Sequence, residues 1–117
     1  MNFKKLKVVA ISSILLGLSN TAFSAEFWRT GTVIRILSDS KYYGGCMVNI
    51  SSNIANGCPN NGWVSLDCSE TFYQGQSKNN MAIVLTALAT NKRLSLKVDN
   101  SKKHDGYCIA RRVDIIK

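Results

Sequence analysis

The sequence contains little proline, histidine or acid. It has one proline, one histidine and seven acidic residues among 117. The single proline and the eight glycines exclude collagen-like and proline-rich low-complexity chains. Neither a glycine-rich phosphate loop nor a nucleophile elbow is present. The hydrophobic fraction of 45% is that of an ordinary folded protein, and the length corresponds to one domain.

The scarcity of histidine and acids leaves few candidates for chemistry. Asp67 and Glu70 could form an acid–base pair, but solvated loop carboxylates after a strand are the favoured interpretation. His104 lies between Lys103 and Asp105 in a polar turn and is expected at the surface. A zinc site needs close ligand pairs such as C-x-x-C, which the sequence lacks. We therefore expect no catalytic residues, no metal and no cofactor, and the enzyme class is disfavoured.

The first 25 residues have the three parts of a secretory signal peptide. Three lysines precede an apolar run over 8–18, and mostly small residues follow. The run is too short to span a bilayer, which favours a signal peptide over a membrane anchor. Cleavage is expected after Ser24 or Ala25. Removing 25 residues, with three lysines and no acid, leaves 92 residues and lowers the net charge from +8 to +5.

All four cysteines lie after this segment, and they are Cys46, Cys58, Cys68 and Cys108. Export delivers a chain to an oxidising compartment, where disulfides persist. An even number of cysteines in a short exported chain predicts two disulfides, here with three possible connectivities. Such bridges stabilise a domain whose core is small. The expected location is therefore the periplasm or the exterior.

The exported part alternates between strand-like and turn-like patterns. Segments rich in β-branched or alternating residues are separated by polar stretches, of which 51–62 is the longest. Gly44–Gly45 is expected to bend the second strand, and Asp105–Gly106 to form the tight turn before the last one. The predicted strands are 31–37, 42–50, 63–68, 94–98 and 107–116.

One segment has helical periodicity. A helix is predicted over 78–90, with Ser77 as its N-cap and Asn91 ending it in the left-handed conformation. The opposite face carries no charge, which suits either a subunit contact or a helix that is simply poor in charge. The apolar residues expected to face the core are Met81, Val84, Leu85 and Leu88. The uncharged residues of the opposite face are Asn79, Ile83, Thr86, Ala87 and Thr90.

The order β-β-β-α-β-β is that of the oligonucleotide/oligosaccharide-binding (OB) fold. We expect a mainly β domain over 26–117, a five-stranded OB-fold-like barrel with one helix between strands three and four; an open α+β sheet is the alternative. In an OB barrel the third strand lies beside the fifth, which favours the pairing Cys68–Cys108 and leaves Cys46–Cys58. The alternative is Cys46–Cys68 with Cys58–Cys108, because strands two and three would form a hairpin.

Aromatic residues are the main candidates for binding. Trp63 is predicted to face away from the barrel interior, where it could stack on a sugar or base, lie in a subunit interface, or cover one end of the barrel. Tyr42 and Tyr43 lie between the first two strands, where OB folds commonly bind ligands. Arg111, from the basic pair Arg111–Arg112, completes the set of candidate ligand-binding residues. Nucleic acid is disfavoured as a ligand because the protein is exported.

The exported chain resembles the B subunits of bacterial AB5 toxins, nearest to the pertussis-like and subtilase-cytotoxin branch. The resemblance rests on Gly31-Thr32-Val33-Ile34 in the first strand, on Tyr43 to Cys46, and on Cys58. Cys68 and Cys108 depart from that pattern, and no sugar-binding motif of the family can be placed. The resemblance implies a homopentameric ring with helices lining its pore, a catalytic toxin subunit as partner, and recognition of host-surface glycans.

These observations predict an exported, non-enzymatic binding module for a glycan or another cell-surface ligand, with no membrane span after processing. The alternative is a periplasmic OB-fold interaction or stress protein that binds an envelope component or a partner protein. An inhibitor or immunity-type protein would also fit the small size and the disulfides.

Overall fold

The computed structural model describes residues 25–117, and the predicted signal peptide lies outside the described residues except for Ala25. The described chain is mainly β, with five strands, one α-helix and two disulfides, as the sequence predicts. No helix in this part of the chain is long and apolar enough to cross a membrane. The elements in chain order are β1 (Glu26–Ser38), η1 (Tyr43–Gly45), β2 (Cys46–Ile50), β3 (Trp63–Ser65), α2 (Ser77–Thr90), β4 (Arg93–His104) and β5 (Tyr107–Ile116).

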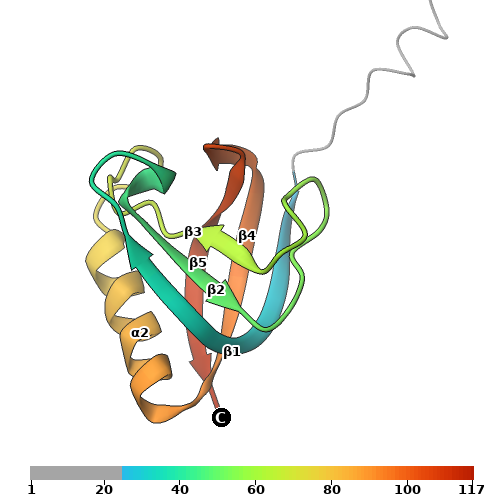
Figure 1. Ribbon diagram of the computed structural model, residues 1–117, viewed down its shortest axis with the longest axis vertical. Coiled ribbons are helices and arrows are strands. Elements are labelled where there is room, and N and C mark those ends of the chain that lie inside the picture. The colour runs from blue at the N-terminus through green and yellow to red at the C-terminus, as the bar shows by residue number, and fades with distance from the viewer. Residues whose placement is uncertain (1–24) are drawn as a thin grey trace, which may run out of the picture.

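The five strands close into a barrel in the order β1-β2-β3-β5-β4 (Figure 1). Neighbouring strands are antiparallel except β3 and β5, which are parallel. The helix connects β3 to β4 and lies along the side of the barrel, where it packs mainly against β5 and β1. The loop η1 and the turn between β4 and β5 meet at the upper end of both views.

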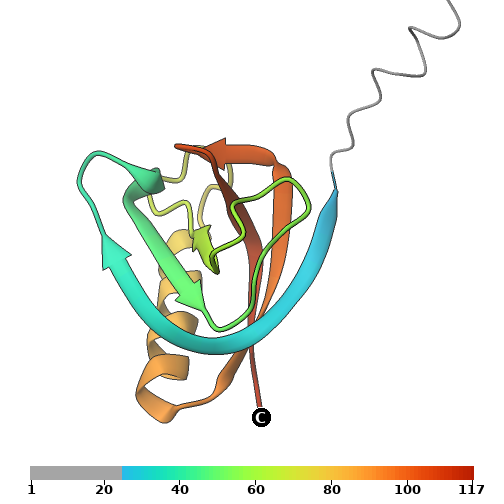
Figure 2. The same cartoon turned by 45° about the vertical axis from the view of Figure 1, so that its right-hand side comes forward.

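The long strand β1 curls around the barrel and pairs with a different neighbour along each half (Figure 2). Its first half pairs with β4 and its second half with β2. The register shifts between Val33 and Arg35, so Ile34 stands outside the ladder and is 59% exposed. Gly31 permits the close approach of the next loop, because a Cβ there would lie 2.8 Å from Ser51 Oγ.

The sequence prediction misplaced the bend that curls the sheet. Gly44 and Gly45, predicted as a bulge or sharp bend within the second strand, have φ of 70° and 92° and belong to the turn η1. The second strand therefore begins at Cys46 rather than at Tyr42. The register irregularities of the sheet lie instead in β1 and between β4 and β5.

The barrel interior is filled by alternate residues of the strands. Along β4 the buried apolar positions are Leu94, Leu96 and Val98, all 0% exposed, as the alternation in the sequence predicts. Val64 and Leu66 are equally buried, at 0% and 1%. Each such side chain contributes about 1.5–3 kcal/mol when fully buried. The core is therefore a contiguous apolar centre, and half-cystines from both disulfides border it.

The helix α2 turns a different face to the barrel from the one predicted. Val84 and Ala87 are buried, although the sequence pattern places Ala87 on the opposite face. Leu85 and Leu88, predicted to lie in the core, are 50% and 44% exposed. The smaller side chains of Val84 and Ala87 allow the helix to approach the barrel closely. The two leucines are left at the surface, beside the partly buried Met81.

The two ends of the helix differ in how well they were predicted. Ser77 is the first helical residue rather than the N-cap, a position held by Gln76. The hydroxyl of Ser77 donates a hydrogen bond to Glu70 at 2.5 Å instead of capping the helix. Asn91 ends the helix in the left-handed conformation at φ 55° and ψ 40°, which confirms the prediction.

The structure corrects the expected disulfide pairing. Cys46 is bonded to Cys68 and Cys58 to Cys108, with Cα–Cα distances of 5.5 and 5.7 Å. The preferred pairs, Cys46–Cys58 and Cys68–Cys108, were wrong, and the alternative is observed. The backbone N–H of Leu66 donates to the carbonyl of Cys46 at 3.0 Å, so the chain leaving β3 stays beside β2. This path brings Cys68 to Cys46.

The loop 51–62 explains the second disulfide. Asn100 and Lys103, two side chains of β4, donate hydrogen bonds to backbone carbonyls of this loop at 2.8 and 2.7 Å. The loop is thereby held against β4, the neighbour of the strand that carries Cys108. Cys58 consequently reaches Cys108 across the β4 side of the barrel. Two disulfides in so short a domain indicate an oxidising compartment, such as the periplasm or the exterior.

Candidate ligand-binding site

A cavity of about 170 Å³, lined by aromatic and apolar side chains, opens at the end of the barrel that carries η1 and the start of β5. Five elements contribute one residue each, namely β1, η1, β2, β3 and β5. We call this cavity the aromatic pocket, and its lining residues are Leu37, Tyr43, Met47, Trp63 and Tyr107.

The tyrosine rings at the pocket contact one another. Tyr43 and Tyr107 are packed edge to face, with ring centroids 5.8 Å apart and an interplanar angle of 79°. The ring centroid of Tyr42 lies 6.1 Å from that of Tyr43, and Tyr42 is 48% exposed. Trp63 is partly buried, and Met47 is 2% exposed. The structure therefore brings together three of the predicted residues, Tyr42, Tyr43 and Trp63.

Two cations lie over the aromatic rings at this end of the barrel. The guanidinium carbon of Arg35 is 6.0 Å from the ring centroid of Trp63. The ammonium nitrogen of Lys41 is 5.2 Å from the ring centroid of Tyr42. Such cation–π contacts stabilise the rings modestly and place N–H donors beside them. The surroundings of the pocket thus combine apolar ring surface with positively charged donors.

The fourth predicted residue, Arg111, does not belong to the aromatic pocket. It lies on β5, where its side chain is 52% exposed and paired with Glu26 at 2.5 Å. Tyr107, which the sequence argument did not select, takes its place in the pocket. The signal for Tyr107 was its position directly after the predicted Asp105–Gly106 turn, which brings it to the same barrel end as η1. Both turn residues have positive φ, of 52° and 86°.

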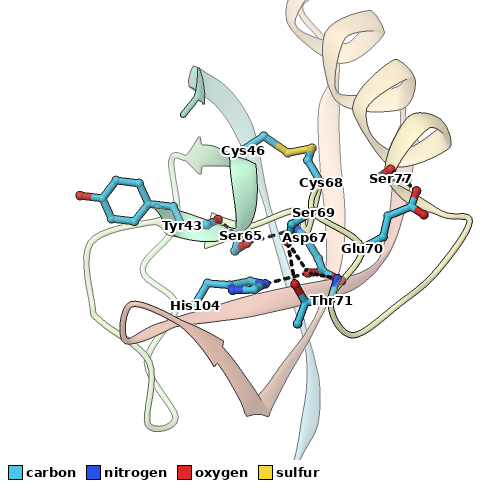
Figure 3. The surroundings of a disulfide bond; sticks show 10 residues. All are labelled: Tyr43, Cys46, Ser65, Asp67, Cys68, Ser69, Glu70, Thr71, Ser77 and His104. Atoms are coloured by element: carbon cyan, nitrogen blue, oxygen red, sulfur yellow. Dashed lines mark hydrogen bonds and ion pairs between the residues drawn. A yellow bond between two sulfur atoms is a disulfide. The ribbon is translucent and has the colours of Figure 1, made fainter. Parts of the chain in front are cut away.

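A buried carboxylate organises the backbone behind the pocket (Figure 3). Asp67 is 2% exposed and accepts hydrogen bonds from the backbone N–H groups of Thr71, Phe72 and Tyr73, at 3.2, 2.9 and 2.9 Å. Its carboxylate also contacts His104 Nε2 at 2.7 Å. One side chain two residues after β3 therefore fixes both the following loop and the end of β4.

The same contacts set the charge state of Asp67. Burial raises the pKa of the carboxyl group, and it is the largest single influence. The hydrogen bonds from His104, Tyr73 and Phe72 together outweigh burial, so the pKa of Asp67 lies below its usual range. Asp67 is consequently ionised at neutral pH and acts as a fixed acceptor.

This network holds Tyr43 in the aromatic pocket. Ser65 Oγ donates to the carbonyl of Tyr43 at 2.8 Å and accepts from the N–H of Asp67 at 3.1 Å. The N–H of Tyr43 donates to Asp105 Oδ2 at 2.7 Å. The imidazole of His104 packs closely on Gly44, the residue after Tyr43. A Cβ at Gly44 would lie 2.3 Å from His104 Cδ2. The turn η1 is therefore clamped from both sides.

Two expectations about polar residues were wrong. Asp67 is buried rather than solvated, and the side chain of His104 is only 15% exposed rather than at the surface. Glu70 bonds elsewhere, accepting from the N–H of Gly75 at 3.2 Å and from the hydroxyl of Ser77 at 2.5 Å. Both carboxylates are thus occupied by loop and helix groups. These contacts position the surrounding backbone.

Residues 25–117 contain no cluster of three or more histidine, cysteine or acidic side chains that could hold a metal ion. Comparisons of the chain with protein-family models, with curated proteins and with solved structures gave no match. The resemblance to AB5 toxin B subunits therefore stays a prediction, and function has to be argued from the site itself.

Proposed function

We propose that the protein is an exported, non-enzymatic binding module whose aromatic pocket binds a glycan. The convergence of Tyr43, Trp63 and Tyr107 around an open apolar cavity carries this proposal. The β-β-β-α-β-β barrel has the layout of the OB fold, and the pocket lies where OB barrels take oligosaccharides. The fold assignment and the binding role therefore support each other.

The chemistry of the pocket suits a sugar. Aromatic rings offer apolar faces against which the C–H face of a sugar ring packs, and tyrosine hydroxyls can bond its hydroxyl groups. Arg35 and Lys41 add N–H donors beside the rings. Because drug-sized ligands fill pockets of about 300–1,000 Å³, the smaller cavity here favours one sugar unit at the end of a chain.

A glycan array with the purified exported protein tests this function. We expect binding to a defined set of glycans, and loss of that binding in Trp63→Ala. Ile34→Ala is the matched control, because Ile34 is 59% exposed and lies outside both the ladder and the pocket. Thermal melting of both variants separates a lost site from a lost fold. No glycan binding, together with retention in the periplasm, would instead favour the alternative of a periplasmic interaction protein.

We further propose that the protein assembles into a ring, in line with its resemblance to AB5 toxin B subunits. The support is the exposed apolar face of α2, where Leu85 and Leu88 remain uncovered in the single chain. Met81, Ala82 and Leu85 line a shallow apolar hollow on this face. Such a surface suits contact with another chain. A pentameric mass by light scattering would support the toxin-like assembly and its catalytic partner, and a strictly monomeric mass would remove both.

A further inference from the structure

A second cavity, of about 400 Å³, lies between the first turn of α2 and the outer surface of β4 and β5. It shares no lining residue with the aromatic pocket. We call it the basic groove. Its polar lining comprises three amides, three cations and one carboxylate, namely Gln76, Asn79, Asn80, Lys97, Arg111, Arg112 and Asp114.

Positive charge exceeds negative charge around the basic groove. The carboxylate of Glu26 lies 2.5 Å from Arg111 Nη1 and 3.7 Å from Lys97 Nζ. The carboxylate of Asp114 lies 2.9 Å from Arg112 Nε. Two carboxylates thus face three cations. The first turn of α2 adds to the excess, because it contains no acidic residue and has no side-chain cap. The N-terminus of a helix carries partial positive charge and favours anions.

One lining residue is an amide in the first turn of α2. Asn80 is only 7% exposed and lines the groove, while no buried side-chain nitrogen or oxygen of the described residues lacks a hydrogen-bond partner. An amide presents both a donor and an acceptor. Asn80 therefore adds uncharged hydrogen-bonding groups to the cationic lining of the groove.

An exposed aromatic ring flanks the cations. Trp28 on β1 stands in register with Lys97 on β4, which is in register with Arg112 on β5, so the three form a row across the barrel. The ring of Trp28 is contacted by both cations, at 5.9 Å from Lys97 Nζ and 5.6 Å from Arg112 Cζ. Trp28 is nevertheless 43% exposed and available for stacking.

We propose that the basic groove binds an acidic saccharide, meaning a sugar ring that carries a carboxylate or a sulfate. The oxyanion would be bound by Arg112 and Arg111, whose guanidinium groups match planar oxyanions. Hydroxyl groups would bond the amides of Asn79 and Asn80, and Trp28 would pack against the ring. The basic groove shares no residue with the aromatic pocket, so the proposal for one site can be refuted while the proposal for the other stands.

The distribution of tryptophan makes the proposal testable by fluorescence. The sequence has two tryptophans, one at each site, so Trp63→Phe leaves Trp28 as the only tryptophan reporter. The variant is titrated at low salt with glucuronate, glucose 6-sulfate, methyl glucoside and inorganic phosphate. We expect a saturable change in Trp28 emission with the two acidic sugars, at concentrations at least about tenfold lower than for methyl glucoside or phosphate.

Charge-matched variants decide whether the groove is responsible. Arg112→Gln and Asn80→Asp, each made in the single-tryptophan protein, are expected to weaken acidic-sugar binding at least about tenfold. Lys92→Gln removes one positive charge at an exposed position outside the groove and should leave the affinity unchanged. The side chain of Arg112 is 64% exposed, so its replacement tests binding without threatening the fold.

Three results would overturn the proposal. Equal affinities for phosphate and glucuronate would make the groove a site for simple anions rather than for sugars. Equal losses of acidic-sugar affinity in Arg112→Gln and Lys92→Gln would mean that binding depends on general surface charge rather than on the groove. The absence of any saturable change in Trp28 emission would refute binding at the groove.

Discussion

Replacing Asp67 by asparagine removes the charge from the network behind the aromatic pocket while keeping the shape of the side chain. The carboxylate accepts three backbone N–H bonds at 3.2 Å or less and contacts His104 at 2.7 Å. Each hydrogen bond to a charged group contributes about 1.5–3 kcal/mol, and the amide keeps one acceptor oxygen. We therefore expect Asp67→Asn to lower the free energy of unfolding by about 2–4 kcal/mol.

Denaturant unfolding with both disulfides intact measures this loss. Asp114→Asn is the control, because its carboxylate belongs to an exposed ion pair with Arg112 that is worth at most about 1 kcal/mol. A loss in Asp67→Asn no larger than that in the control would refute the view that Asp67 organises the loop and the end of β4.

The pH dependence gives a second check on the same variant. Because the pKa of Asp67 is below its usual value of 3.8 in the folded state, the folded protein binds fewer protons there than the unfolded chain. The contribution of Asp67 is therefore fully present above the unfolded pKa and is lost as pH falls through the folded pKa. The stability difference between the wild type and Asp67→Asn should be constant near neutral pH and shrink in acid. A difference that stays constant to low pH would contradict this assignment.

Three further predictions concern the fold and its surface. Gly44→Ala should destabilise the protein by more than about 1 kcal/mol in thermal melting, because its Cβ would clash with His104 at a φ of 70°. Replacing the disulfide Cys58–Cys108 by two serines should cost about 2–4 kcal/mol in denaturant unfolding, since it closes a long loop. Leu85→Gln should leave the melting temperature unchanged, because the side chain is half exposed, but lower the mass of any oligomer in light scattering.

The elements that the sequence predicted well have local signals. The strand over 107–116 has the predicted bounds, because Asp105–Gly106 forces a tight turn before an uninterrupted run. Asn91 ends the helix as predicted because asparagine tolerates the left-handed conformation. The grouping of Tyr42, Tyr43 and Trp63 followed from the order of the strands, which local patterns were sufficient to establish.

The features that sequence reasoning missed depend on contacts between distant segments. Asp67 and His104 are 37 residues apart, and neither has a local signal for burial. The disulfide pairing depended on where the loop 51–62 lies, which hydrogen bonds from β4 determine. The buried face of the helix was predicted wrongly because apolar spacing alone does not reveal that the small side chain of Ala87, rather than that of Leu88, packs against the barrel.

The central claim is that a glycan binds at the aromatic pocket, and the emission of Trp63 tests it most directly. In Trp28→Phe, Trp63 is the only tryptophan. This variant is titrated with the glycan that binds most strongly on the array, and calorimetry provides the independent affinity. A saturable change in Trp63 emission with the calorimetric midpoint is predicted. Saturation in calorimetry without any change in Trp63 emission would contradict the claim and place the ligand elsewhere.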